Sequence, residues 1–272
     1  TALIIALDCW LQPGMVYVGL SRAKSLSQLY ILGKFPVDKA VPWPDAMVEM
    51  KRLEALDLSL PIQIPLNQFE IVSLNVISLP SHFEDVKVDP NLMSAKVLLL
   101  QETSLTTNLE DSLRFKLEGK MCHFNSSGHR KGLATYFTPD FSVVMDVTHG
   151  RFQMTSISND ELTITNVYRS GDAGKRFDES LTNIIEDKSK THILMGDWNF
   201  CQRDEPSHSV KRFLESNGFI SGFAEPQATH IQGRCLDQIF VRFVGEPFVF
   251  ESSVKVCIYS DHEPISMKIP VG

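Results

Sequence analysis

Four short polar motifs end apolar runs in the last two thirds of the chain, and their residue types could bind a metal ion and transfer protons. The motifs contain Asn75 in SLNVISL, Gln101 and Glu102 in VLLLQET, Asp197 and Asn199 in HILMGDWNF, and Ser260, Asp261 and His262 in IYSDHEP. Burying carboxylates, carboxamides and an imidazole without partners costs several kcal/mol. We therefore expect these side chains to converge on a charged group such as a metal ion.

Hydrolysis of a phosphodiester is one reaction that would use these residues. It needs a divalent cation, a nucleophilic water and donors that stabilise the developing oxyanions. Mg²⁺ prefers hard oxygen ligands and takes only one or two protein carboxylates. Glu102, which closely follows four apolar residues, is the expected metal carboxylate. Asn75 could add a carbonyl oxygen to the same ion or hold Glu102 through its amide hydrogens.

The remaining motifs could handle water and phosphate. In GDWN, the glycine allows a tight exit from the strand, and the spacing of two places Asp197 and Asn199 on the same face of an extended segment. Asp197 could orient or deprotonate the attacking water, and Asn199 could donate to a phosphate oxygen. His262 needs a partner that fixes its second ring nitrogen. Asp237, at the start of an apolar run, is the candidate partner, and Asp261 is expected nearer the metal.

The strands and helices that must position these residues can be predicted from the pattern of apolar and polar residues after Glu70. Short apolar runs typical of strands occur at 71–77, 96–101, 133–137, 142–147, 151–157, 162–168, 192–196, 238–243, 254–258 and 264–269. Helix-like stretches lie at 110–117, 177–187 and 209–216. This order predicts an α/β fold, a four-layer α/β sandwich in which two packed β-sheets are flanked by helices.

Residues 1–56 differ in pattern and form a separate predicted domain. Apolar runs predict strands within 1–12 and at 28–32, with a short helix through 15–24 and another helix at 45–56 among prolines. A linker is expected at 57–67, and the second domain at 68–272.

Composition limits the classes of function. Residues 1–67 carry six acids and six bases, so the net charge of −7 lies wholly in residues 68–272. A broad basic face for nucleic acid is therefore not evident from composition. The five cysteines include no C-x-x-C pair, which indicates neither a disulfide framework nor a zinc site and favours an intracellular location. No apolar stretch reaches the roughly 18 residues of a membrane span.

The motifs SLNV, QET, NVYR, GDWN, LDQIF and YSDH, in this order, resemble the endonuclease/exonuclease/phosphatase superfamily with its DNase-I-like fold. The resemblance covers residues 68–272. It implies Mg²⁺ (or Mn²⁺) at Asn75 and Glu102 with Asp261 beside the metal, Tyr168 on the scissile phosphate, Asp197 and Asn199 at water and phosphate, and Asp237 paired with His262. Gly132 and Thr229 match structural positions of the family, and Thr229 is also a substrate-binding candidate.

Two departures from the family pattern concern the metal and the substrate. Many abasic-type members carry an aspartate two residues after the first asparagine, where this chain has Ile77. The arginine that often follows the tyrosine motif could be Arg169, or its place could be taken by Lys175 or Arg176, so all three are substrate-binding candidates. Among the other histidines, only His230, next to Thr229, is a candidate to line the cleft.

The segment VYVGLSRAKSLSQLYILGKF resembles the last motifs of PIF-type superfamily-one DNA helicases. In such motors the arginine of this motif, here Arg22, would reach the nucleotide γ-phosphate. The chain has no G-x-x-x-x-G-K-[ST] loop, so no helicase activity is expected from this fragment. A helicase end followed by a nuclease resembles the architecture of Helitron-type transposons.

These observations predict a Mg²⁺-dependent phosphodiesterase, specifically a DNA endonuclease, as a monomeric domain of a larger helicase-containing nuclear protein. Two alternatives stay open. The same fold could act on phosphoinositides or other small phosphoesters, which the acidic balance favours. The chain could also be a catalytically decayed binding module, which Ile77 and the missing nucleotide-binding loop favour.

Overall fold

The computed structural model describes residues 3–6, 29–32, 68–105, 113–125, 131–171, 173, 175–205 and 208–270. The chain divides into two compact units, Thr1–Ile64 and Pro65–Gly272. In the first unit, strand β1 (Leu3–Ala6) pairs in parallel with β2 (Leu29–Leu32), at two of the expected strand positions. The helices expected at 15–24 and 45–56 lie outside the described residues, as does Arg22.

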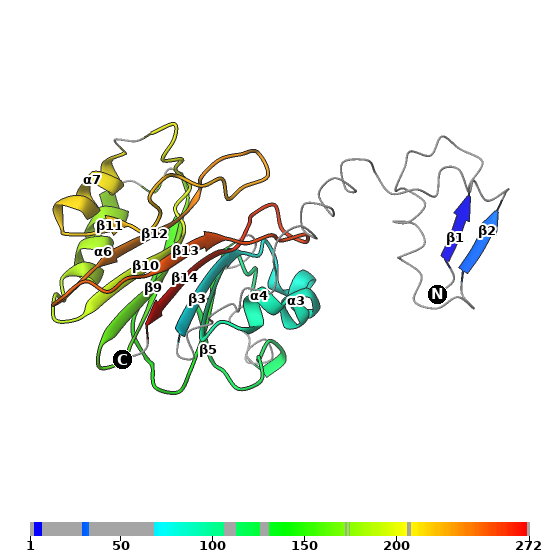
Figure 1. The fold of residues 1–272 in the computed structure, drawn as a ribbon, viewed down its shortest axis with the longest axis horizontal. Coiled ribbons are helices and arrows are strands. Elements are labelled where there is room, and N and C mark those ends of the chain that lie inside the picture. The colour runs from blue at the N-terminus through cyan, green and yellow to red at the C-terminus, as the bar shows by residue number, and fades with distance from the viewer. Residues whose placement is uncertain are drawn as a thin grey trace, which may run out of the picture. The chain divides into compact units, whose positions relative to one another are not determined.

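In the part of the second unit that the structure describes, the strands form two six-stranded sheets (Figure 1). The first sheet has the order β13-β14-β3-β4-β6-β5, in which only β3 and β4 are parallel neighbours. Its strands are β3 (Gln68–Asn75), β4 (Val97–Gln101), β5 (Met121–Asn125), β6 (Leu133–Phe137), β13 (Glu251–Val254) and β14 (Ile265–Pro270).

The second sheet has the order β11-β12-β10-β9-β8-β7, and its parallel neighbours are β9 and β10. Its strands are β7 (Ser142–His149), β8 (Phe152–Ser158), β9 (Leu162–Arg169), β10 (Thr191–Asp197), β11 (Ile220–Ser221) and β12 (Asp237–Arg242). Each sheet thus places one parallel pair near its centre, with both strands of that pair ending at the same edge.

An apolar core joins the two sheets. Successive side chains on a strand point to opposite faces, so Ile71 belongs to the layer between the sheets while Val72 faces outward. Both faces of the central strands are therefore buried, which explains their nearly continuous apolar runs. The layer between the sheets includes Ile71, Val97, Leu99, Ile157, Ile164, Ile193, Met195, Ile239, Val241, Ile265 and Met267.

Helices cover the outer face of each sheet (Figure 1). On the first sheet, α3 (Leu79–Val88) and α4 (Pro90–Met93) bury apolar side chains against Val72 and Leu98. On the second sheet, α6 (Lys175–Ile185) and α7 (Ser209–Ser216) do the same against Leu194. The buried residues of α6 recur at helical spacing: Phe177, Leu181 and Ile184. The predicted four-layer α/β sandwich is confirmed.

Three details differ from the sequence prediction. The strand predicted at 254–258 is wrong, because β13 ends at Val254 and the exposed Val256 and Ile258 follow it. The edge strands β5 and β11 and the helices α3 and α4 were not expected. Of the helix-like stretch 110–117, the structure describes helical backbone only at 113–114. No helix among the described residues is long and apolar enough to cross a membrane.

Candidate active site

Most of the predicted site residues gather at one end of the sandwich, where the parallel strands of both sheets end. In the first sheet, Asn75 at the end of β3 lies opposite Gln101 at the end of β4, and Glu102 follows directly. In the second sheet, Asp197 at the end of β10 lies between Tyr168 on β9 and Asp237 on β12. The fold therefore brings together residues that are far apart in the sequence.

Two hydrogen bonds join these residues across the gap between the sheets. The amide nitrogen Nδ2 of Asn75 donates to Oδ2 of Asp197 at 3.0 Å. Nδ1 of His262, just before β14, lies 2.7 Å from Oδ2 of Asp237. The hydroxyl of Ser260 donates to the backbone oxygen of Asn75 at 2.7 Å, which ties the loop of His262 to the end of β3. Both sheets thus contribute to one connected polar cluster.

Asp197 is the buried centre of this cluster. Its carboxylate accepts from Asn75 and from both the backbone nitrogen and the side-chain nitrogen of Asn199, each at 3.0 Å. Burial, and next the negative charge of Asp237, raise the pKa of Asp197, while His262 and the hydrogen bonds oppose this change. A carboxylate with a raised pKa has a higher proton affinity than an exposed aspartate, which suits a base.

Gly196 allows Asp197 to take this position. A Cβ atom on Gly196 would lie 1.9 Å from the backbone oxygen of Val167 on β9. Only glycine therefore permits the close approach of the two strands one residue before Asp197. The expected tight exit from the strand is corrected, because Gly196 lies within β10.

His262 is held as an acid by its neighbours. Burial alone lowers the pKa of His262, but the carboxylate of Asp237, followed by Asp197 and Asp261, outweighs burial and raises the pKa to about 10. Nδ1 is engaged by Asp237, and Nε2 lies 3.9 Å from Oδ1 of Asp261. The imidazolium therefore has Nε2–H left for a ligand.

Thr229 supports Asp237. Its fully buried hydroxyl oxygen accepts from the backbone nitrogens of Leu236 and Asp237 at 3.1 and 3.0 Å. The expectation that Thr229 binds substrate is therefore corrected: the residue positions the start of β12.

Glu102 and Tyr168 form the other side of the cluster. Burial, and next the negative charges of Glu102 and Asp197, raise the pKa of Tyr168 well above its usual range. For a metal, Glu102 offers a half-buried carboxylate, and Asn75 offers Oδ1, which accepts from the backbone nitrogen of Ile77 at 3.0 Å and retains a second lone pair. This set of hard oxygen donors fits Mg²⁺.

Unusual backbone conformations mark the same end of the sandwich. Among the described residues, the non-glycine residues with positive φ are Ile77, Glu102, Ser104 and Asn199, with φ between 50° and 61°. All four follow the ends of β3, β4 or β10. A β-branched residue such as Ile77 is particularly unfavourable in this conformation. Such strain is typical of functional sites.

The arginine candidates do not join the cluster. Arg169 follows Tyr168 on β9, so its side chain points to the opposite face; its guanidinium donates to the backbone oxygen of Trp198 at 3.1 Å and lies over the ring of Phe177. The expectation that Arg169 binds substrate is therefore corrected. Arg176 is exposed at the start of α6, 3.3 Å from the ring of His149, and the side chain of Lys175 lies outside the described structure.

Two further residues lie beneath and beside the cluster: Asn166, which was not expected there, and His230, which was a candidate to line the cleft. Asn166 on β9 accepts from the amide of Gln101 at 2.7 Å and so links the two sheets below the site. Its polar type at an inward-facing position of LTITNVY was the signal that could have found it. His230 forms an isolated β-bridge with His262, and their rings lie 4.9 Å apart.

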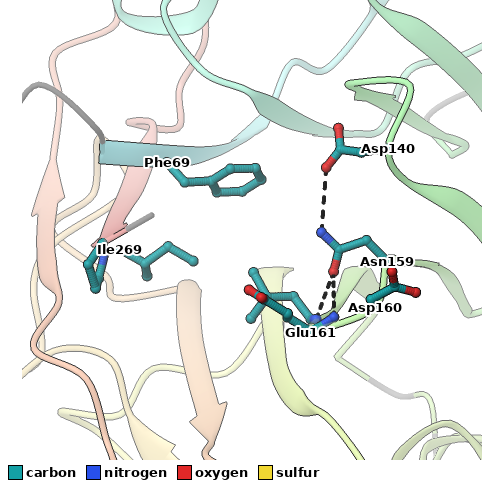
Figure 2. Close-up of a pocket in the computed structure, with 8 residues that line it drawn as sticks. Phe69, Asp140, Asn159, Asp160, Glu161 and Ile269 are labelled. Carbon is teal, nitrogen blue, oxygen red and sulfur yellow. Dashed lines mark hydrogen bonds between the residues drawn. The ribbon is translucent and has the colours of Figure 1, made fainter. Parts of the chain in front are cut away.

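A pocket of about 380 Å³ lies at the opposite end of the sandwich (Figure 2). Its lining includes Phe69, Ile269 and the carboxylates of Asp140, Asp160 and Glu161. Asn159 bridges this lining by donating to Asp140 and accepting from the backbone of Glu161. None of the predicted site residues lines this pocket, so it is distinct from the candidate active site.

Comparisons with known proteins agree with this geometry. The model of the endonuclease/exonuclease/phosphatase family matches residues 72–262. Among solved structures, AP endonuclease LMAP from Leishmania major has a TM-score of 0.62 at 15% identity, covering 76% of this chain and 89% of that one. The 3′ phosphatase NExo from Neisseria, bound to product DNA hairpin, has a TM-score of 0.58 at 19% identity, covering 75% and 100%.

The mannosyl-6-phosphatase Bt3783 from Bacteroides thetaiotaomicron has a TM-score of 0.53 at 15% identity, covering 75% and 100%. At these identities the structural likenesses establish the fold alone. No curated protein sequence matches the chain. The family match spans well over half of the chain, and this protein therefore belongs to the endonuclease/exonuclease/phosphatase family, whose members are hydrolases of phosphodiesters or phosphoesters.

Proposed function

We propose that this protein is a Mg²⁺-dependent (or Mn²⁺-dependent) DNA endonuclease. The observation that carries the proposal is the pair of cross-sheet hydrogen bonds from Asn75 to Asp197 and from His262 to Asp237. These bonds hold Asp197 and His262 at the end of the sandwich where Glu102 follows β4, which supports their proposed roles. Members of this family generally use divalent metals such as Mg²⁺.

In the proposed mechanism, these residues act on the attacking water and on the phosphate. Asp197 takes a proton from the attacking water, and Asn199 orients the Asp197 carboxylate and reaches a phosphate oxygen. The water oxygen bonds to phosphorus as the bond to the leaving oxygen breaks. His262, held by Asp237, donates to the phosphate as negative charge develops, and Tyr168 contacts the same phosphate.

A divalent cation bound by Glu102 and Asn75, with Asp261 nearby, would neutralise charge on the phosphate. The role assigned to Asp261 rests on its place beside His262, since its carboxylate lies 3.9 Å from Nε2 of that residue. Asp261 is about half exposed, so it can face both solvent and substrate.

Basic side chains beside the site support DNA as the substrate. Lys131 donates to the backbone oxygen of Gly150, and the backbone nitrogen of Ser170, just past the end of β9, donates to the oxygen of Arg151. With Arg176 near His149, these contacts place Lys131, Arg151 and Arg176 at the same end of the sandwich as Tyr168. Such side chains are suited to backbone phosphates. Two proteins of similar fold carry names that refer to nucleic acid, AP endonuclease and a phosphatase bound to DNA.

A phosphatase for small phosphoesters is the second candidate. The net charge of −7 favours it because a negative protein repels long polyanions, and a mannosyl-6-phosphatase shares the fold. A decayed binding module is the third candidate, supported by Ile77 at the expected aspartate position. It predicts neither Mg²⁺ binding in calorimetry nor turnover.

Substrate comparison separates these candidates. The purified chain is incubated in Mg²⁺ or Mn²⁺ with supercoiled plasmid, single-stranded DNA, a phosphoinositide headgroup and a sugar phosphate. We expect nicking of the plasmid and little release of inorganic phosphate from the small esters. Turnover of the small esters with intact DNA would favour the phosphatase.

We also propose that residues 1–56 are the end of a PIF-type helicase, joined through 57–67 to the nuclease at 68–272 within a nuclear protein. The proposal rests on the VYVGLSR motif, and the parallel pair β1 and β2 occurs where two strands were expected. The upstream coding sequence tests it: a nucleotide-binding loop is expected there, and its absence would contradict the helicase assignment.

A further inference from the structure

His230 occupies a rigid position beside His262. Its backbone nitrogen donates to the oxygen of Arg234 at 3.1 Å, and the next nitrogen, of Ile231, donates to the oxygen of Asp261 at 2.9 Å. The ring meets that of His262 edge to face at 4.9 Å, and only 12% of its side chain is exposed. The imidazole of His230 is therefore held in a fixed position next to the imidazole of His262.

One hydrogen bond determines which nitrogen of His230 carries the proton. The backbone nitrogen of Gln232 donates to Nδ1 of His230 at 3.2 Å, so Nδ1 must present its lone pair. In a neutral imidazole the other nitrogen then bears the proton. Nε2–H lies 3.6 Å from Oδ2 of Asp261, beyond hydrogen-bond distance. Among the residues that the structure describes, none accepts a hydrogen bond from Nε2 of His230, so this donor can serve an acceptor from outside the protein.

The same assignment argues against a metal ion in this corner. The candidate ligand atoms of His230, Asp261 and His262 lie within 4.8 Å of one another, a spacing that a cation could bridge. A protonated Nε2 has no lone pair for a metal, and moving the proton to Nδ1 would break the bond from Gln232. A donor for an anion is therefore the better description of His230.

We propose that His230 is a further substrate-binding residue, whose Nε2–H donates to a non-bridging oxygen of the scissile phosphate beside His262. A ring nitrogen of His230 and one of His262 lie within 4.8 Å of each other, and Nε2 of each lies 3.6 and 3.9 Å from the carboxylate of Asp261. Two N–H donors at such a spacing can both contact one phosphate, since each N–H···O bond spans about 2.9 Å. The inference rests on the proposed phosphodiesterase function. It adds that the site distinguishes the two non-bridging oxygens, because the donor is fixed by backbone contacts.

Two variants separate hydrogen bonding from packing. His230→Phe keeps an aromatic ring against His262 and removes the donor, whereas His230→Gln keeps an N–H donor near the Nε2 position and removes the ring. We expect kcat/KM for DNA hydrolysis to fall about 10-fold to 100-fold in His230→Phe and to stay within about 5-fold of wild type in His230→Gln. The reverse order would show that the ring only packs, and would overturn the proposal.

Phosphorothioate substrates test the contact atom by atom. Sulfur replaces one non-bridging oxygen in a short duplex with a single scissile linkage, giving separate Rp and Sp substrates. Sulfur accepts hydrogen bonds poorly, so His230→Phe should reduce the rate penalty for one diastereomer and leave the other unchanged. Equal penalties in wild type and variant for both diastereomers would contradict the assigned contact.

A binding measurement that does not depend on catalysis tests the role of His230 separately from the proposed endonuclease activity. In protein labelled with ¹⁵N-histidine, long-range ¹H–¹⁵N spectra identify the protonated nitrogen of His230 directly. We expect Nε2–H in the free protein and a shift of that signal when inorganic phosphate is added. Nδ1–H in the free protein, or no shift with phosphate, would overturn the inference even if DNA is cleaved. DNA left intact alongside the expected shift would instead contradict the endonuclease assignment alone.

Discussion

The metal corner of the site, formed by Asn75 and Glu102, lies next to a residue whose side chain is unfavourable for its backbone conformation. Ile77 has φ of 61°, a conformation that disfavours β-branched side chains, and its nitrogen donates to Oδ1 of Asn75. It stands where the family resemblance suggests an aspartate. Aspartate and asparagine tolerate this conformation better than isoleucine does.

Replacement of Ile77 tests how many ligands the metal corner has. In Ile77→Asp, an added carboxylate next to Asn75 should lower the Mg²⁺ concentration for half-maximal activity by about 3-fold to 10-fold. Ile77→Asn is the matched control, because it relieves the same backbone strain without adding charge. Both variants should unfold at higher urea concentration than wild type. Equal Mg²⁺ dependence in the two variants would show that residue 77 does not approach the metal.

The pairing of Asp237 with His262 makes a prediction about pH. The carboxylate of Asp237 contributes the largest raising effect on the pKa of His262, which reaches about 10 against the lowering effect of burial. A donor imidazolium is therefore present below that pH and absent above it. Asp237→Asn should lower this pKa, move the alkaline limb of kcat toward neutral pH, and reduce kcat at pH 8 about 100-fold. An unchanged alkaline limb would show that His262 does not act as the acid.

For individual residues, type and spacing in the sequence predicted most of the side chains that lie together in the cluster. Carboxylates and amides at the ends of apolar runs converge because those runs are neighbouring strands, as at Asn75 and Glu102. Strand alternation could have excluded Arg169, which follows the inward-facing Tyr168. The role of Thr229 depends on a backbone turn that spacing does not reveal.

Between elements, the polar link from Gln101 to Asn166 joins the sheets beneath the site. Nε2 of Gln101 donates to Asn166 at 2.7 Å and to Ser73 at 3.0 Å, and the amide of Asn166 donates to Thr135 and to two backbone oxygens. The nitrogens of both amides are thus paired, whereas the buried Oε1 of Gln101 has no partner among the described residues. The paired donors hold the ends of β4 and β9 together, because a buried donor left without its partner costs free energy.

A double-mutant cycle measures this link. Gln101→Leu and Asn166→Leu should each lower the free energy of unfolding by about 1–3 kcal/mol, because each leaves a buried partner unpaired. The double variant should lose at least about 0.5 kcal/mol less than the sum. Urea unfolding gives the values, and Gln101→Leu combined with Ser253→Ala, on the distant edge strand β13, should be additive. Additivity in the first cycle would contradict the link.

The elements themselves were predictable where their hydrophobic pattern was strong. The runs at β4 and β10 are buried on both faces and nearly continuous, and α7 was predicted with its observed bounds. The strand β5, with the polar His123 and Asn125 in MCHFN, has no such pattern and depends on pairing with β6. Sequence periodicity cannot reveal a strand that lacks an apolar pattern and is held mainly by its pairing with a neighbouring strand.

At the scale of the whole molecule, a DNA endonuclease of net negative charge would have to bind DNA, which is itself negatively charged. The basic residues Lys131, Arg151 and Arg176 at the end of the sandwich that carries the site would supply a local attraction despite the net charge of −7. Local basic residues neutralise phosphates and release counterions, so binding becomes weaker as salt rises.

Salt dependence therefore tests the path of DNA. The double variant Arg151→Ala with Arg176→Ala should weaken duplex binding and lower the slope of log affinity against log salt by about 1 for each phosphate that is no longer neutralised. Lys188→Ala is the matched control, since Lys188 is exposed in the loop before β10, at the opposite end from Asp197. Affinities are measured by fluorescence anisotropy in Ca²⁺. An equal weakening in the Lys188 variant would place the DNA elsewhere.

The most direct test of the account is the rate at which Glu102→Gln nicks supercoiled plasmid in Mg²⁺. This substitution keeps the size of the side chain and removes the proposed metal carboxylate. We expect a loss of about 100-fold or more with an unchanged unfolding midpoint, while Glu118→Gln, at an exposed turn, nicks like wild type. Wild-type nicking by Glu102→Gln would contradict the assignment of this end of the sandwich as a metal-dependent nuclease site.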